Sequence, residues 1–234
     1  MKKQIIPILL LFTLLLTGCF NRERDLSISN YNKARDHYIS AHGISYSKTV
    51  TTKFLSDGIV THKVETYENE VEFSANGNVR RLSSYMERKD QGILTHRINR
   101  FFASDGVYIH TTNISLGLQN KDYFNKTYEE HYDASSMHSP VNIIPHFVED
   151  DISEFVIEEN GKGSKMTFKA PAPSYVNSEE LITYKVTLNN KDQFSTINYT
   201  YLDQGNNEIT VNIVIKGFNS FVKVVLPSDL DTYK

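Results

Sequence analysis

The sequence predicts a mostly β, α+β domain built on a strongly curved antiparallel sheet. Apolar and polar residues alternate with a period of two over about ten segments, and such clean alternation means that each strand buries one face only. Two segments break this rhythm with helical spacing, one near the N-terminus and one within residues 113–150. Helices at these places would cover the concave face of the sheet. A two-sheet sandwich competes with this interpretation but gives neither helical segment an obvious role.

The first helix is expected from about Ser29 to Ala41. Ser29 or Asn30 can cap its start, and Gly43 stands where the helix would stop. Apolar residues recur at three- and four-residue steps and form one face, which consists of Tyr31, Ala34, Tyr38 and Ala41. The pattern therefore predicts an amphipathic helix that lays this face on the sheet.

Strands are expected on both sides of the second helical segment. Asp57-Gly58 and Asn76-Gly77 are typical of hairpin turns. Partly helical spacing of four aromatic residues predicts one or two short helices with loops within 113–150, namely Tyr123, Phe124, Tyr128 and Tyr132. The strand-like segments are residues 44–54, 60–64, 71–75, 79–88, 92–103, 107–111, 152–158, 166–168, 182–188, 197–201 and 209–215.

The N-terminus has the features of a bacterial lipoprotein leader. Lys2 and Lys3 precede an apolar run over residues 5–16, which is shorter than the roughly 20 residues that a membrane-spanning helix needs. A lipobox-like sequence follows, made of Leu16, Thr17, Gly18 and Cys19. The sequence thus predicts a signal peptide over 1–18, a lipidated cysteine and tether over 19–27, and a single domain over 28–234. An uncleaved N-terminal anchor is the alternative.

Cys19 is the single cysteine of the chain, which rules out an intramolecular disulfide. Lipidation gives this lone thiol a role, and several acyl chains on one cysteine suffice for stable anchoring. We expect an exported protein, lipid-anchored to the outer face of the bacterial cell membrane, with a Gram-positive host favoured because no sorting aspartate follows Cys19. The membrane is then a partner through the N-terminal lipid.

Charge and motifs exclude several classes of function. Removing Lys2 and Lys3 with the leader leaves 23 basic and 28 acidic residues, and this mild acidic balance argues against a nucleic-acid partner. The chain has no Gly-x-Ser-x-Gly motif, so no catalytic residue is assigned and we expect no enzyme. Three histidines lie in one irregular segment beside acidic residues, but their spacing fits no compact ligand motif: His131, His138 and His146. No metal site and no cofactor are expected.

The order of these segments resembles the LolA/LppX-like superfamily of lipoprotein carriers. A lipobox, a short tether, an amphipathic helix, a strand meander and a helical insertion are followed by the closing segments Ile182–Leu188, Phe194–Tyr201 and Ile209–Ile215, then Phe218-Asn219 and Leu226-Pro227. The resemblance covers nearly the whole mature chain and implies an unclosed half-barrel with a helical lid. It also implies that acyl chains would bind between sheet and helices.

The expected function is therefore the binding of a hydrophobic or lipid ligand by a non-enzymatic lipoprotein. Large apolar side chains on the inward strand faces either fill a core or line a cavity, and the sequence leaves both open: Tyr46, Phe54, Phe73, Phe102, Tyr184 and Tyr199. Individual ligand-binding residues cannot be assigned. The alternative is a protein-binding module, such as an immunity lipoprotein that neutralises a secreted toxin at the outer face of the membrane.

Overall fold

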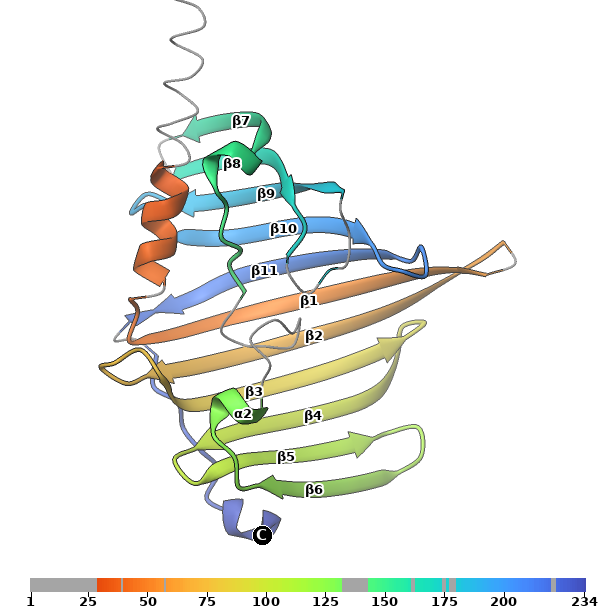
Figure 1. The fold of residues 1–234 in the computed structure, drawn as a ribbon. Helices are drawn as coiled ribbons and strands as arrows, with labels where there is room; N and C mark the ends of the chain where they lie inside the picture. Colours follow the sequence, from red (N-terminus) through yellow and green to blue (C-terminus); the bar gives the residue numbers. More distant parts are fainter. Residues whose placement is uncertain are drawn as a thin grey trace, which may run out of the picture.

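Eleven antiparallel strands form a single curved sheet in the computed structural model (Figure 1). The structure describes residues 29–38, 40–56, 58–131, 143–160, 163–173, 176, 180–219 and 222–234. The strands are β1 (Gly43–Ser56), β2 (Ile59–Phe73), β3 (Val79–Asp90), β4 (Ile93–Ala103), β5 (Gly106–Asn113), β6 (Leu118–Phe124), β7 (Ser153–Asn160), β8 (Gly163–Pro171), β9 (Leu181–Asn189), β10 (Phe194–Leu202) and β11 (Glu208–Phe218).

The first strand of the described chain, β1, lies in the middle of the sheet rather than at an edge. The strand order is β6-β5-β4-β3-β2-β1-β11-β10-β9-β8-β7, so the chain steps outward from β1 to β6, crosses to β7 at the other edge and returns to β11 beside β1. No described residue pairs with the outer side of β6 or β7, so the sheet is unclosed. The predicted curved, unclosed half-barrel is confirmed, and the sandwich alternative is wrong because all the described strands belong to one sheet.

The predicted N-terminal helix is confirmed over residues 29–38, and it lies against the concave face of the sheet (Figure 1). Its apolar face is buried as expected at Tyr31, Ala34 and Tyr38. The ring of Tyr31 contacts Phe168 of β8 and Phe194 of β10, with centroids 6.0 and 5.2 Å apart. The helix ends slightly before the predicted boundary. A half-barrel with a helix on its inner side is the fold that the resemblance to the LolA/LppX-like superfamily implies.

Two clusters of buried residues form the core on this concave side. The larger one joins the helix, residues 143–147 and the inward side chains of β8–β11 and β1, while the smaller one lies beneath β2–β5 and includes Leu82, Phe102 and Val107. All members of both clusters lie at Tyr31 or beyond. A chain that begins after Cys19 therefore keeps every described member of both clusters.

Part of the segment 113–150 differs from its prediction. Residues 118–124 form strand β6, which pairs with β5 from Val107↔Phe124 to Asn113↔Leu118. The helical prediction was wrong here because this edge strand is exposed on both faces, so that no apolar alternation shows in its sequence. The helical turns are α2 (Tyr128–His131) and a 3-10 turn at Glu149–Asp151, and residues 132–142 lie outside the described part.

The C-terminus secures the β6 edge on the opposite, convex side. A 3-10 turn (Leu230–Tyr233) places Tyr233 edge-on against Tyr108 of β5, with ring centroids 5.8 Å apart. Lys121 of β6 donates to Thr232 at 2.6 Å and pairs with Asp229 at 3.2 Å. The chain end thus fixes an edge strand that has little apolar burial of its own. None of the described helices has the length and apolar character that crossing a membrane requires.

Candidate functional site

The candidate site is the face of the sheet that carries the helix, called the inner face. Residues directly opposite each other in an antiparallel pair point to the same side of a sheet. The register links Tyr184 of β9 through Tyr199 and Val211 to Val50 of β1, and then to Glu65 of β2. The inner face is therefore continuous from β9 to β2, and it changes from apolar to charged along this path.

The apolar half of the inner face consists of β8–β11 and part of β1. Beneath the helix it is filled by stacked and edge-on aromatic rings, among them Phe147 and Tyr184 with centroids 4.8 Å apart. The buried Tyr184 hydroxyl donates to the carbonyl oxygen of Pro171 at 3.0 Å, and the Tyr31 hydroxyl donates to that of Pro145 at 2.7 Å. Burial raises the pKa of Tyr31 well above its usual range, so this hydroxyl stays a donor. The helix end of the face is a packed core.

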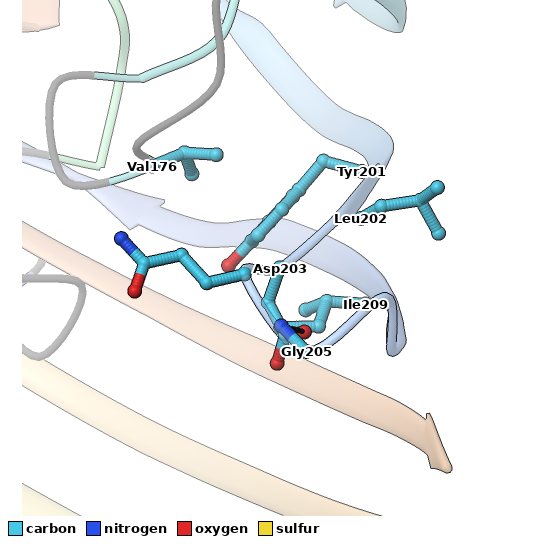
Figure 2. Close-up of a pocket in the computed structure, with 7 residues that line it drawn as sticks. Val176, Tyr201, Leu202, Asp203, Gly205 and Ile209 are labelled. Atoms are coloured by element: carbon cyan, nitrogen blue, oxygen red, sulfur yellow. Dashed lines mark hydrogen bonds between the residues drawn. The ribbon is translucent and has the colours of Figure 1, made fainter. Parts of the chain in front are cut away.

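Away from the helix, the same face opens into a pocket at the ends of β10 and β11 (Figure 2). The pocket has a volume of about 290 Å³, and Tyr201 and Ile209 contribute inner-face side chains to its wall, with Val176 approaching from the other side. The turn at its rim is held by Asp203, whose carboxylate accepts backbone hydrogen bonds from Gly205 and Asn207 at 2.8 and 2.9 Å. The apolar face is therefore accessible at the pocket end of the strands.

A second pocket lies near the opposite ends of the same two strands. Its volume is about 470 Å³, and Phe194, Ile215 and Phe218 contribute apolar side chains to it. Phe194 also contacts Tyr31 of the helix, which places this pocket close to the end of the packed aromatic core. Both pockets therefore border the apolar half of the inner face.

The adjacent part of the inner face, on β1 and β2, holds a cluster of buried charged side chains. Lys48 and Glu65 are only 6% and 8% exposed. The Glu65 carboxylate lies 3.7 Å from the Lys63 amine and accepts a long hydrogen bond, 3.5 Å, from the Tyr67 hydroxyl. The Lys48 amine lies 5.9 Å from the centre of the Tyr67 ring. Charges in such positions are costly unless they are partnered, so this group marks a polar region inside the half-barrel.

Burial governs the ionisation of this group. It lowers the pKa of Lys48 to about 8, against the opposing attraction of Glu65. It also raises the pKa of Tyr67, with the negative charge of Glu65 acting in the same direction. The Lys48 amine is therefore close to a protonation change at neutral to mildly alkaline pH. Groups that titrate inside a concave face are candidates for ligand contact.

The aromatic residues predicted to face inward do so to different degrees. Tyr46, Phe102, Tyr184 and Tyr199 are buried, whereas Phe54 and Phe73 are half-buried. Sequence reasoning missed Lys48 and Glu65. The available signal was that Lys48 stands in phase with Tyr46 and Val50, at a position where the alternation requires an inward side chain.

The other residues that the sequence singled out are not brought together into a site. Cys19 and the rest of the lipobox (Leu16, Thr17 and Gly18) lie outside the described residues, as does His138. His131 lies at the end of α2 against the ring of Phe124, with centroids 5.3 Å apart, and His146 is exposed. Within the described part of the chain, no group of three or more His, Cys, Asp or Glu residues could hold a metal ion.

Comparison with known proteins gives similarity to solved structures only. No family model and no curated protein matches the chain. LprF from Mycobacterium bovis is similar with a TM-score of 0.47 and 10% identity, over 88% of this chain and 98% of that one. An outer membrane lipoprotein-sorting protein domain from Vibrio parahaemolyticus gives 0.32 and 4%, over 85% and 93%. A DUF1329 family protein from Desulfovibrio piger gives 0.27 and 10%, over 85% and 94%.

Proposed function

We propose that this protein is an exported lipoprotein, anchored through Cys19 to the outer face of a Gram-positive cell membrane, that holds a hydrophobic or lipid ligand inside its half-barrel without catalysing a reaction. The observation that carries the proposal is the continuous apolar inner face of β8–β11, which opens at the pocket beside Tyr201 and Ile209. Each methylene group removed from water against such a surface contributes about 0.8 kcal/mol. A partly enclosed acyl chain would therefore bind usefully.

The fold favours a ligand of this kind for a second reason. The helix and Phe147 cover the apolar face at one end of its strands. At the other end, beside Tyr201 and Ile209, no described aromatic residue covers the face in this way. A chain entering at the pocket would contact Tyr201 and Ile209 first and then the side chains of Tyr199 and Val211, which lie two residues further along the same strands. The apolar path therefore leads from the opening toward the interior.

Native mass spectrometry with solvent extraction tests the proposal. The chain from Phe20 onward, which keeps every residue of both described core clusters, is purified from bacteria and measured without denaturation. The expected result is a reproducible extra mass that matches a lipid and is recovered in the organic extract. A clean ligand-free mass, unchanged after incubation with lipid extracts, would contradict ligand binding.

Protein binding at the cell surface is the alternative function, and one observation favours it. The tips of three hairpins, β1–β2, β3–β4 and β5–β6, lie along the same end of the sheet (Figure 1). Exposed aliphatic side chains lie at or near these tips: Leu55, Ile59, Val60, Ile93, Ile114, Leu116 and Leu118. A protein partner that docks at this end of the sheet would cover these exposed apolar side chains. A secreted toxin, recognised by an immunity lipoprotein, would be such a partner. Capture of one defined secreted protein by the ligand-free chain would favour this alternative.

A further inference from the structure

Two tyrosine rings and a carboxylate contact the Lys234 ammonium on the convex side of β5 and β6. Tyr108 and Tyr123 stand opposite each other in the register of these strands, with ring centroids 5.0 Å apart. The Lys234 amine lies 5.9 Å from the centre of the Tyr108 ring and 5.3 Å from that of Tyr123. It also pairs with the Asp105 carboxylate at 2.8 Å. The three residues that contact this ammonium, Asp105, Tyr108 and Tyr123, are named the tyrosine cage.

The walls of the tyrosine cage are held by contacts that do not involve Lys234. The Tyr108 hydroxyl donates to the Asp105 carboxylate at 2.5 Å, and the Tyr123 hydroxyl donates to the backbone carbonyl oxygen of Asp105 at 2.6 Å. Gly106 has a φ of +147°, and a Cβ there would lie only 2.8 Å from Cε2 of Tyr123. The missing side chain therefore lets the Tyr123 ring lie against the β4–β5 turn. The cage is preformed, whichever cation it holds.

Lys234 is an exposed occupant of this cage. Its side chain is 43% exposed and that of Asp105 is 47% exposed. Ion pairs at such positions contribute little net stability, because water solvates both charges when they separate. The neighbouring turn has a contact of its own with the sheet, since the Lys121 amine lies 4.6 Å from the centre of the Tyr233 ring. Lys234 can therefore leave the cage while the turn stays in place, and another cation can take its position.

The chemistry of the cage selects a particular kind of cation. The hydrogen bond with Asp105 raises the pKa of Lys234 above its usual value, and the same bond lowers the pKa of the Asp105 carboxyl, so both groups are charged at neutral pH. Tyrosine rings attract an ammonium through the negative charge on their faces. The carboxylate also accepts an N–H bond, which a primary ammonium can donate and a quaternary ammonium cannot. The cage therefore favours a primary alkylammonium.

We propose that the tyrosine cage is a binding site for the primary ammonium group of a ligand, either a free amine or an ethanolamine head group, and that Lys234 occupies it as an internal substitute. The ligand amine replaces Lys234, forms the same ion pair with Asp105 and lies against the same two rings. This site is on the convex side of the sheet, outside the half-barrel. It is therefore independent of the hydrophobic ligand proposed for the inner face.

Calorimetry with butylamine, which matches the end of a lysine side chain, tests the site at pH 7. Butanol is the neutral probe of the same shape, and choline is the quaternary probe. Each is titrated into the chain from Phe20 and into its Lys234→Ala variant. Lys234→Ala should bind butylamine at least tenfold more tightly than the wild type does, because no internal ammonium competes. It should bind choline severalfold more weakly than butylamine, and butanol should not bind.

Substitutions in the Lys234→Ala background test the cage residues. Asp105→Asn removes the negative charge and should lower the affinity for butylamine at least tenfold. Tyr123→Leu removes one aromatic wall, should lower it severalfold, and keeps the cage testable if Asp105→Asn does not fold. Tyr85→Leu is the matched control, because Tyr85 lies on β3 on the same side of the sheet and donates to the Glu87 carboxylate at 2.5 Å. It should leave the affinity within twofold.

Vesicle flotation distinguishes the two sources of the ammonium. Lys234→Ala that floats with phosphatidylethanolamine vesicles but not with phosphatidylcholine vesicles, and is released by butylamine, assigns an ethanolamine head group. Butylamine binding without flotation assigns a free amine.

Three results overturn the cage as a binding site. They are equal affinity for butylamine and butanol, no binding of millimolar butylamine by Lys234→Ala, and equal losses in Tyr85→Leu and Tyr123→Leu. Equal affinity of the wild type and Lys234→Ala would overturn the role of Lys234 as the internal substitute. None of these results bears on the hydrophobic ligand, because its test uses lipid extracts and reads the extra mass that the chain carries.

Discussion

Replacing Lys48 with methionine should remove most of the pH dependence of stability between pH 7 and 9.5. The buried amine of the folded state has a pKa of about 8, whereas an ordinary lysine, as in the unfolded chain, has 10.5. Between these values the unfolded state binds more protons, so the free energy of unfolding of the wild type must rise with pH. Each pKa unit is worth 1.36 kcal/mol, which gives a rise of about 2 kcal/mol from pH 7 to pH 9.5.

The methionine side chain is apolar and of similar length, so it fills the site without a charge. At pH 7 the wild type holds a charged amine at a position that is 6% exposed, at a cost of about 3 kcal/mol relative to its neutral form. Lys48→Met should therefore be more stable at pH 7 by up to about this amount, since the pKa of about 8 already includes the attraction of Glu65. Glu65 keeps its contact with Lys63.

The assay is guanidinium chloride unfolding followed by circular dichroism at half-unit pH steps. It stops at pH 9.5, because above pH 10 the buried Tyr31 and Tyr38, whose pKa values are raised by burial, begin to lower stability. Lys53→Met is the control, since Lys53 lies on the same strand but is exposed on the convex face opposite Glu208. It should keep the full rise. A flat wild-type profile, or an equal rise in Lys48→Met, would refute the burial of a titrating amine on the inner face.

Three other perturbations have defined outcomes. Cys19→Ala should leave the domain folded and move it from the membrane pellet to the supernatant, and a variant that still pellets would exclude the lipid anchor. Gly163→Ala should cost at least about 2 kcal/mol, because φ is +137° and a Cβ would lie 2.0 Å from the Leu188 carbonyl oxygen. Gly58→Ala, also at positive φ but in open space, should cost only about 1 kcal/mol by denaturant unfolding. Tyr233→Ala should cost about 2 kcal/mol and speed amide hydrogen exchange in β6, and unchanged exchange there would mean that the C-terminal turn does not secure this edge.

The sequence was most informative where one face of a strand is apolar. The alternation over Ile182–Leu188 and Ile209–Ile215 predicted β9 and β11 correctly, because every second residue there is buried, except Ile215, which is half-buried. It failed for β6, which is polar on both faces and is fixed by pairing with β5 and by contacts with the C-terminus. Alternation also says nothing of strand order, so the pairing of β1 with β11 was not predictable.

The polar part of the candidate site was hidden for a related reason. Lys48 and Glu65 occupy inward positions, where a pattern based on hydrophobicity expects apolar residues. Each therefore reads as an interruption of a strand rather than as part of a site. Only the register, which places Lys48 opposite Tyr67 and Val50 opposite Glu65, shows that these charged residues lie together on β1 and β2. Residues far apart in sequence cannot be aligned in this way without the pairing.

The position of β1 in the middle of the sheet has a consequence for how the protein folds. The half-barrel consists of two meanders, β1–β6 and β7–β11, each made of hairpins between sequence neighbours, and a single ladder, from Ile44↔Phe218 to Lys53↔Glu208, joins them. Hairpins close short loops and form early, whereas this ladder must close a loop of more than 150 residues and should form late. A ligand that contacts both meanders would then stabilise the β1–β11 ladder and slow its separation. The lifetime of the folded state would therefore depend on whether the ligand is bound.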